Sequence, residues 1–337
     1  MVTIGIIGAG RIGKVHAESI SNYVRNARIK TVADPFMNDS TAQWLEGLGV
    51  QNTTKDYKEI LNDPEIESVL ICSSTDTHSP ISLEAIAAGK HVFCEKPIDH
   101  DLSKIKQVVD ALKGTNLKYQ VGFNRRHDHN FAAVKQAILD GKVGDVHIIK
   151  ITSRDPAPPS PAYIAVSGGM FLDMTIHDFD MVRFLAGCDA EEVYVQSAVL
   201  VDPAIGEAGD VDTAVITLKM ENGAIAVIDN SRQAVYGYDQ RAEVFGSKGM
   251  AATANDTLSS MVLSNAEGVT GEKPLYFFLE RYMQSFATEI KGFIHAIEND
   301  TDTSVGVEDG LKPVLMGLAA KKSVEEHRPV KLSEIEY

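Results

Sequence analysis

The chain begins with VTIGIIGAGRIG, residues 2–13. A run rich in β-branched residues is followed at once by Gly8, Gly10 and Gly13 in the spacing G-x-G-x-x-G, and an amphipathic stretch follows over residues 11–22. A glycine turn between a strand and a helix is the context in which this spacing predicts dinucleotide binding. The first glycine permits a tight turn, the second lets backbone N–H groups approach a pyrophosphate, and the third allows close helix packing. The predicted cofactor contacts at this turn are Gly8, Gly10, Arg11, Ile12 and Gly13.

An acidic residue follows the second predicted strand, residues 27–33. This residue, Asp34, stands 21 positions after Gly13, where a carboxylate typically binds the adenosine ribose hydroxyls. Residues 35–37 contain no arginine to meet a 2′-phosphate. We therefore expect NAD rather than NADP. The alternative is that Asp34 is only a turn residue before Pro35.

Strand and helix patterns continue to alternate along the first third of the chain. Apolar runs at residues 67–72, 91–94 and 119–122 predict strands, and residues 80–88 and 102–112 predict helices. Such alternation predicts an α/β fold with a doubly wound parallel sheet, a Rossmann domain, over residues 1–122. Ligands of such sheets bind at the carboxyl ends of the strands.

Two polar clusters stand at those strand ends. The first contains Ser73, Ser74, Thr75 and His78, whose polar groups and helix N-terminal amides are predicted to hold the nicotinamide half of the cofactor, although helix capping explains each of them equally well. The second is Glu95-Lys96-Pro97, in which Glu95 and Lys96 are predicted to contact the cofactor. A lysine fixed at a strand end by a rigid proline is predicted to reach the cofactor and the reacting centre.

The stretch GGMFLDMTIHDFD, residues 168–180, carries the strongest catalytic signal. A helix starting near Asp173 places Asp173, His177 and Asp180 at i, i+4 and i+7, on one stripe. An imidazole titrates near neutral pH, so we predict His177 as the general base and Asp173 as the carboxylate that orients it. The alternative is a capping Asp173 and a structural His177.

The remaining sequence predicts a second domain. Strand patterns with hairpin signals between them occur at residues 192–201, 212–220, 224–231, 241–245 and 250–254. They predict an α+β domain with a large, mostly antiparallel open sheet. We expect this substrate-binding and oligomerisation domain to cover residues 123–304. A last helix near residues 307–326 follows within the segment 305–337.

Composition excludes several classes of partner. The 337 residues include 32 basic and 47 acidic side chains, a net charge of −15, so nucleic acid and anionic membrane are not expected partners. Three cysteines without framework spacing indicate reduced thiols in a cytoplasmic protein, and the start of the chain does not resemble a signal peptide. No metal-binding spacing and no long apolar run is present, so neither a metal nor a membrane span is expected.

The sequence resembles the glucose-fructose oxidoreductase and inositol dehydrogenase family over essentially its full length. The motifs that carry this resemblance are Gly8 to Gly13, Asp34, Glu95-Lys96-Pro97, and Gly168-Gly169 with Asp173, His177 and Asp180. Within this family, Ser153-Arg154-Asp155-Pro156 and residues 171–178 look most like inositol 2-dehydrogenases. The resemblance implies a homotetramer formed sheet to sheet and a C-terminal helix that packs back on the nucleotide domain. It also implies that Arg126, Asp155 and Tyr236 bind polyol hydroxyls together with Lys96, Asp173 and His177; a solvated Arg125-Arg126 pair and a packing role for Tyr236 stay open.

The expected activity is therefore the NAD-dependent oxidation of a cyclic polyol, myo-inositol to its 2-ketone, in inositol catabolism. His177 or Lys96 is expected to be the immediate base. The alternatives are a scyllo-inositol or aldose dehydrogenase, a glycosidase that uses bound NAD transiently, and a non-catalytic NAD-sensing regulator. The presence of both Lys96 and His177 argues against the regulator.

Overall fold

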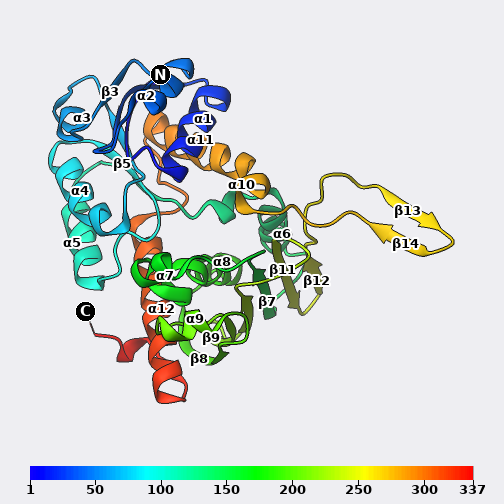
Figure 1. Ribbon diagram of the computed structural model, residues 1–337. Helices are drawn as coiled ribbons and strands as arrows, with labels where there is room; N and C mark the ends of the chain where they lie inside the picture. The colour runs from blue at the N-terminus through cyan, green and yellow to red at the C-terminus, as the bar shows by residue number, and fades with distance from the viewer. Residues whose placement is uncertain (337) are drawn as a thin grey trace. The chain divides into compact units, whose positions relative to one another are not determined.

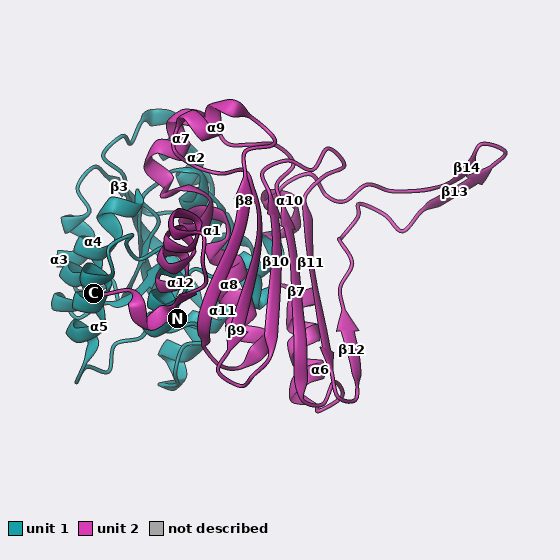
Figure 2. Ribbon diagram, turned by 90° about the horizontal axis from the view of Figure 1, so that it is seen from below, with its two compact units in different colours: residues 1–127, 283–314, 337 teal, residues 128–282, 315–336 magenta. Residues whose placement is uncertain are grey.

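The computed structural model describes residues 1–336, which form two compact units (Figure 2). Unit 1 contains residues 1–127 and 283–314, and unit 2 contains residues 128–282 and 315–336. This division differs from the expected segments 1–122, 123–304 and 305–337. Helix α11, Met283–Asn299, belongs to unit 1 because its apolar side chains Ile290, Phe293 and Ile294 join the core around β1. The second boundary falls inside helix α12, and residue 337 lies outside the described residues.

Unit 1 is built on a six-stranded parallel sheet in the order β3-β2-β1-β4-β5-β6. Figure 1 labels β3 and β5 of this sheet and the helices α1 to α5 around it. The strands are β1 Val2–Ile7, β2 Ala27–Ala33, β3 Asn52–Thr54, β4 Ser68–Ile71, β5 His91–Cys94 and β6 Tyr119–Val121. The helices are α1 Arg11–Tyr23, α2 Asp39–Gly47, α3 Lys58–Asn62, α4 Thr75–Ala87, α5 Leu102–Leu112, the short η1 Asn124–His127, α11 and the start of α12 Val307–Glu326. This confirms the predicted doubly wound domain.

The strand order fixes where a ligand can bind in unit 1. Strands β1 and β4 are neighbours at the sheet centre and are buried along their whole length, as expected for parallel strands covered on both faces. The order reverses between them, so their carboxyl ends form the switch point at which ligands of such sheets bind. The loops that begin at Gly8 and Ser73 follow these two ends.

Unit 2 contains a seven-stranded sheet in the order β12-β11-β7-β10-β9-β8-β15 (Figure 2). Strands β7 and β10 pair in parallel and the other neighbours pair antiparallel, which confirms the predicted mostly antiparallel sheet. Its strands are β7 Val146–Arg154, β8 Ala190–Ala198, β9 Thr213–Met220, β10 Ile225–Ser231, β11 Asp239–Gly246, β12 Gly249–Ala252 and β15 Val330–Lys331. Its other elements are α6 His129–Leu139, α7 Pro161–Ser167, η2 Met170–Met174, α8 Ile176–Ala186, α9 Pro203–Glu207, α10 Phe278–Arg281 and η3 Leu332–Glu334.

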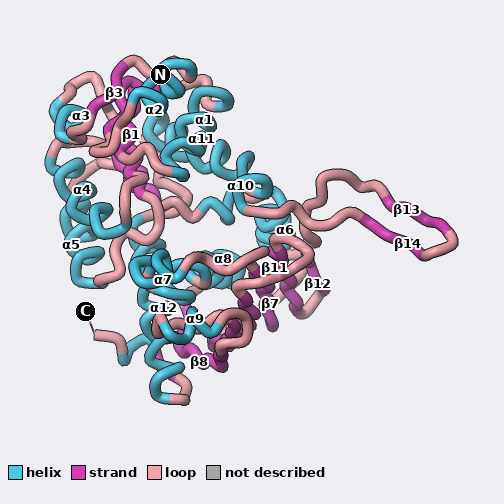
Figure 3. The backbone as a smooth tube through the Cα atoms, viewed as in Figure 1, coloured by secondary structure: helices cyan, strands magenta, loops and turns pink. Residues whose placement is uncertain are grey.

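One face of this sheet is covered and the other is open. Along β9, Ala214, Ile216, Leu218 and Met220 are buried, whereas the intervening side chains are exposed. This period of two is typical of an antiparallel strand with one face in a core. Helices α6 and α8 pack against strands of the sheet. A separate hairpin, β13 Val262–Asn265 and β14 Gly268–Gly271, is exposed along its whole length (Figure 3).

Among the helices of residues 1–336, none combines the length and the apolar character needed to cross a membrane.

Candidate active site

The three glycines of the first turn have different surroundings. Gly8 has a φ of +102°, and a Cβ there would lie 2.6 Å from the backbone carbonyl of Cys72. A Cβ on Gly13 would lie 2.0 Å from the carbonyl oxygen of Gly8. Around Gly10, in contrast, no atom of the described chain lies within 4 Å of such a Cβ. The turn therefore needs glycine for packing at its two ends and leaves open space at the start of α1, where a pyrophosphate fits against helix amides.

Asp34 is held against this turn. Its Oδ2 accepts a hydrogen bond of 2.6 Å from the backbone N–H of Ala9, and its Oδ1 accepts one of 2.8 Å from Phe36. The side chain is half-buried at the carboxyl end of β2. Asp34 thus lies beside the glycine turn, in the position that the ribose-binding prediction requires.

The loop after β4 is fixed to the loop after β5 by His78. Its Nδ1 lies 2.8 Å from the carbonyl oxygen of Pro97, and its Nε2 lies 3.0 Å from that of Ser73. Because a carbonyl only accepts, the two contacts together are best satisfied by a doubly protonated ring. Burial lowers the pKa of His78, but Cys94 and the two carbonyls outweigh it and raise the pKa to about 9. His78 is 2% exposed, so its side chain stabilises the predicted cofactor loop from the buried side.

Lys96 is the partly exposed residue in an otherwise buried stretch from Val92 to Asp99. The preceding residue, Glu95, points into the core, where its Oε1 lies 2.6 Å from Nε2 of His16. The following residue, Pro97, is the one whose carbonyl His78 holds. The backbone of Lys96 is therefore fixed by contacts of both neighbouring residues, Glu95 and Pro97. Glu95 was grouped with the cofactor contacts, but the bond that its side chain makes here is to His16.

In unit 2 the helix predicted to begin at Asp173 has a different start. Residues Met170–Met174 form a π-helical turn, in which Thr175 donates its backbone N–H to the carbonyl of Met170, and the regular helix begins at Ile176. Gly169, with a φ of +77°, precedes the turn, and Asp210 accepts from the backbone N–H of Met170. The glycine pair is therefore followed by a hydrogen-bonded turn that contains Asp173. This turn leads directly into helix α8, which contains His177.

Asp180 differs in burial from the other two residues of the predicted stripe. Asp180 is 1% exposed and lies on the buried side of α8, whereas Asp173 and His177 are half-buried. The wide π turn changes the angular relation between Asp173 and the residues of α8, whereas His177 and Asp180 both lie within the regular part of this helix.

Two carboxylates of the predicted site share one arginine. Asp173 accepts a hydrogen bond of 3.0 Å from the hydroxyl of Tyr163 through Oδ1, and its Oδ2 lies 3.5 Å from Nη1 of Arg232. The same nitrogen lies 3.4 Å from Oδ2 of Asp155. Arg232 is 2% exposed, so it meets these carboxylates away from bulk water. The structure brings Asp155 and Asp173 together, through a residue that the sequence analysis missed.

A second group missed from the sequence ties α8 to the sheet. The side chain of Asn230 on β10 donates a hydrogen bond of 2.9 Å to Asp178 and accepts one of 2.6 Å from the hydroxyl of Thr175. Asp178 and Thr175 flank the segment that carries His177. The only sequence signal was the series of polar residues Asp229 to Arg232 at the end of a strand.

Arg126 and Tyr236 each have partners within their own unit. Arg126 donates a hydrogen bond of 2.9 Å to Asp309. The Tyr236 hydroxyl donates to Asp239 at 2.6 Å and accepts from Arg154 at 3.2 Å. These contacts fix both side chains, and their binding of polyol hydroxyls stays a prediction.

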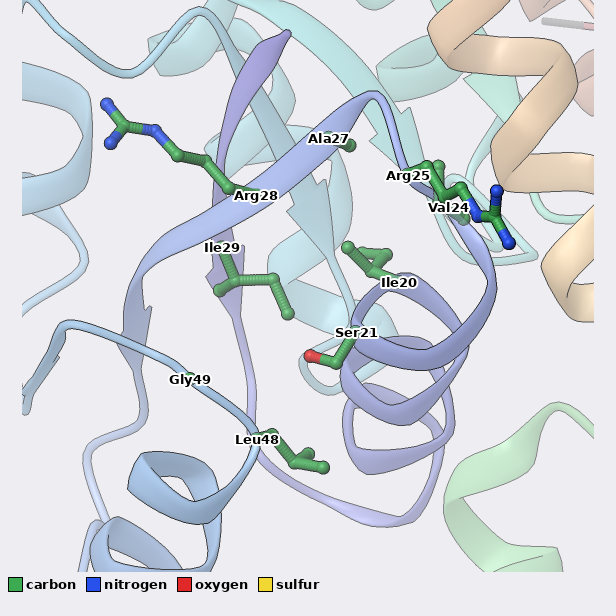
Figure 4. A pocket seen from close by; sticks show the side chains of 9 residues that line it. All are labelled: Ile20, Ser21, Val24, Arg25, Ala27, Arg28, Ile29, Leu48 and Gly49. Carbon is green, nitrogen blue, oxygen red and sulfur yellow. The ribbon is translucent and has the colours of Figure 1, made fainter.

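A small pocket in unit 1 lies away from the predicted cofactor site (Figure 4). It is lined by Ile20 of α1, Val24 directly after this helix, Ala27 and Ile29 of β2, and Leu48. These β2 residues belong to the amino-terminal half of the strand, whereas Asp34 follows its carboxyl end. The pocket is therefore separate from the switch point, and we assign the predicted chemistry to the residues described above.

Comparisons with known proteins agree with this geometry. Residues 2–123 match the family model described as an oxidoreductase family with an NAD-binding Rossmann fold, and residues 131–252 match the GFO/IDH/MocA C-terminal domain. A myo-inositol 2-dehydrogenase of Thermotoga maritima is 48% identical, over 98% of this chain and 99% of its own length. An inositol 2-dehydrogenase of Rhizobium meliloti is 45% identical, over 98% and 99% of the two chains.

A solved structure gives the same result for the fold. Scyllo-inositol dehydrogenase of Lactobacillus casei, crystallised with NAD(H) and scyllo-inositol, superposes with a TM-score of 0.90 at 31% identity, over 99% of each chain. The fold is thus shared over nearly the whole chain. This protein belongs to the GFO/IDH/MocA family of oxidoreductases, with an NAD-binding Rossmann domain at its amino-terminal end.

Proposed function

We propose that the protein is an NAD-dependent inositol 2-dehydrogenase that oxidises a secondary alcohol of a cyclic polyol, with myo-inositol as its substrate. The observation that carries the proposal is the cluster in unit 2, where Arg232 joins Asp155 and Asp173 close in sequence to the half-buried His177. Carboxylates beside an imidazole suit an uncharged, hydroxyl-rich substrate, which is recognised by hydrogen bonds. The two relatives named inositol 2-dehydrogenase at 45% and 48% identity support the same choice.

The cofactor site follows from the glycine turn and its neighbours. The open space at Gly10 and the position of Asp34 fit the pyrophosphate and the adenosine ribose, with Arg11, Ile12 and the Ser73-Ser74-Thr75 loop as further contacts. NAD supplies the acceptor for the hydride that leaves the carbinol carbon. Residues 35–38 are Pro, Phe, Met and Asn, so no basic side chain directly after Asp34 favours a 2′-phosphate.

The chain's own residues handle the proton. His177 accepts the proton of the substrate hydroxyl at an imidazole nitrogen, and Asp173, held by Tyr163 and Arg232, orients the ring and stabilises its charged form. The Nζ of Lys96 donates a hydrogen bond to the substrate oxygen and stabilises the developing alkoxide. In the alternative assignment Lys96 is the immediate base. Asp155, Arg126 and Tyr236 bind the other hydroxyls.

A second candidate is the oxidation of scyllo-inositol. The solved scyllo-inositol dehydrogenase of Lactobacillus casei favours it, since it shares the whole fold at 31% identity. Parallel assays of NADH formation with both inositols and with glucose separate these activities. Net NADH formation also separates a dehydrogenase from a glycosidase that returns the hydride within each turnover, and from a regulator that binds NAD without turnover.

We further propose that the protein is a cytoplasmic homotetramer. The open face of the unit 2 sheet carries apolar side chains that are about half exposed, among them Val215 at 48%, Ile225 at 53% and Phe245 at 46%. Ile225 and Phe245 both pair with the exposed Ile148 in the strand register, and a continuous exposed apolar patch of this kind is typical of subunit interfaces. All three cysteines are free thiols, as expected in a reducing compartment. Light scattering coupled to gel filtration tests the tetramer, and Val215→Lys is expected to reduce the measured mass.

A further inference from the structure

A carboxyl group lies deep in unit 1 with no hydrogen-bond partner. Glu289 on α11 is 0% exposed, and neither of its oxygens has a partner among residues 1–336. One atom each of Glu289, His16 and Glu95 lie within 4.8 Å of one another. Since buried polar groups are normally satisfied, a buried carboxyl this close to a second one needs a physical explanation.

His16 and Glu95 form the ordered part of this cluster. His16 is 0% exposed, and its ring lies between Phe93 and Phe286 at centroid distances of 5.1 Å and 5.7 Å. Its Nε2 meets Oε1 of Glu95 at 2.6 Å. A Cβ on Gly122 would lie 3.0 Å from the Glu95 carboxyl carbon, so glycine leaves room for this carboxylate. The aromatic rings fix the imidazole, and the imidazole fixes Glu95.

The neighbouring groups determine whether the carboxyl group of Glu289 is protonated. Glu95 has a hydrogen-bond partner in His16, whereas Glu289 has none among residues 1–336, so the surroundings stabilise a negative charge less at Glu289 than at Glu95. Burial, and then the charge of Glu95, raise the pKa of Glu289 well above its usual value. Burial also raises the pKa of the Cys72 thiol, which interacts electrostatically with Glu95 and Glu289. The cluster therefore holds a single negative charge, because two neighbouring buried carboxylates do not both ionise.

A metal ion explains the same three residues less well. Two ligands of a tetrahedral ion with bonds of about 2.1 Å stand about 3.4 Å apart. The 2.6 Å separation of His16 and Glu95 is instead the length of a direct hydrogen bond.

We propose that His16 and Glu289 are positioning residues, which hold the Glu95 carboxylate and, through it, the backbone that presents Lys96. The proposal rests on the proposed role of Lys96 in the reaction. His16 anchors the residue before Lys96, as His78 anchors the residue after it. Glu289 contributes as a neutral acid: an ionised Glu289 would repel Glu95 and loosen its bond to His16.

The state of Glu289 is tested without an activity assay. The variant Glu289→Gln resembles the neutral acid, and its thermal unfolding is compared with the parent protein from pH 5 to pH 9. A raised folded pKa gives stability that is present below the unfolded pKa and is lost as pH rises through the folded pKa. We therefore expect the melting temperature of the parent to fall increasingly below that of Glu289→Gln as pH rises. The control Glu46→Gln, at an exposed glutamate of helix α2 in the same unit, is expected to show a constant difference.

A melting difference of Glu289→Gln that stays constant over this range would mean that Glu289 is ionised throughout and would overturn its assigned state. Stoichiometric metal in the purified parent that is lost from Glu289→Gln would overturn the assignment as well.

Positioning of Lys96 is tested with a pair of variants at His16. His16→Leu removes the donor, and we expect kcat to fall between about tenfold and 100-fold while the KM of the polyol stays nearly constant. His16→Gln keeps a donor and is expected to recover most of kcat. Independently of turnover, the rate at which an amine-directed reagent modifies Lys96, read by peptide mass spectrometry, should change in His16→Leu and return in His16→Gln. Folded His16→Leu protein with parental kcat and parental Lys96 labelling would overturn the proposal.

This labelling also separates two kinds of failure. If the parent makes no NADH with any polyol, the proposed function fails. The pH dependence of Glu289→Gln and the labelling of Lys96 still decide whether His16 and Glu289 act as proposed.

Discussion

The guanidinium of Arg232 lies 3.5 Å from the carboxylate of Asp173. Both side chains belong to unit 2, but they come from different elements: Arg232 follows strand β10, and Asp173 lies in the π-helical turn before α8. The same guanidinium group reaches Asp155 at 3.4 Å. A single buried cation thus fixes the two carboxylates that we assign to proton handling and hydroxyl binding.

Loss of this cation should cost both stability and activity. We expect Arg232→Met to lower the free energy of unfolding by about 3 kcal/mol, because it leaves two carboxylates without their buried partner. We expect kcat/KM for the polyol to fall at least about 100-fold. Arg232→Lys keeps the charge but lacks the planar fork, so an intermediate loss is expected. Chemical denaturation and initial rates of NADH formation measure the two effects. In the control Arg328→Met, which breaks an accessible ion pair with Glu334, activity should be unchanged.

Substitution of the two proposed proton-handling residues should act on turnover. Lys96→Ala and His177→Ala are each expected to lower kcat by about 10²- to 10⁴-fold. NAD affinity, measured by calorimetry, should be largely kept in His177→Ala. The variant that removes the immediate base is also expected to lose the acidic limb of the pH–rate profile. Lys113→Ala, an exposed lysine at the end of α5, serves as control. Near-parental turnover in both active-site variants would show that the proposed mechanism is wrong.

The raised pKa of His78 gives the folded protein a pH dependence. Because the folded pKa, about 9, lies above the usual histidine value of 6.5, the stabilisation is complete below about pH 6.5 and is lost as pH rises through 9. The contribution is on the order of 3 kcal/mol. In His78→Gln the deficit in unfolding free energy should be constant below pH 6.5 and shrink toward pH 9, as followed by urea denaturation. His295→Gln, an exposed histidine on α11, should show no such trend. A His78→Gln deficit that grows with pH would contradict the assignment of a charged ring.

Cofactor choice should depend on the residues after β2. The double variant Asp34→Ser and Pro35→Arg removes the carboxylate and adds a cation for a 2′-phosphate, so the ratio of kcat/KM for NAD over NADP is expected to fall at least about tenfold. Some loss with NAD is also expected, because Asp34 accepts the backbone N–H of Ala9. Steady-state rates with both cofactors measure the ratio. An unchanged ratio would mean that Asp34 is a turn residue, as the alternative reading of the sequence holds.

The sequence predicts most of unit 1 because its signals are local. The spacing of Gly8, Gly10 and Gly13 after an apolar run, and the acidic Asp34 after the next one, depend on short-range chemistry that recurs in dinucleotide-binding sheets. The alternation of strands and helices then determines the class of sheet.

The parts that sequence analysis missed depend on contacts between distant residues. Arg232 stands 59 positions after Asp173, and the bond between His16 and Glu95 joins residues 79 positions apart. The π-helical turn at residues 170–174 leaves no periodic signal, and the burial of Asp180 depends on tertiary packing that the sequence does not show. Helix α11 was placed in the second domain because it follows that domain in sequence, whereas its apolar face packs in unit 1.

The most direct test of the proposed function is NADH formation by the purified protein with NAD, offered myo-inositol, scyllo-inositol and glucose in parallel, with NADP as the cofactor control. We predict sustained NADH formation with myo-inositol, weaker rates with the other two, and little with NADP. If the protein binds NAD but forms no NADH with any of these polyols, it is not the dehydrogenase proposed here.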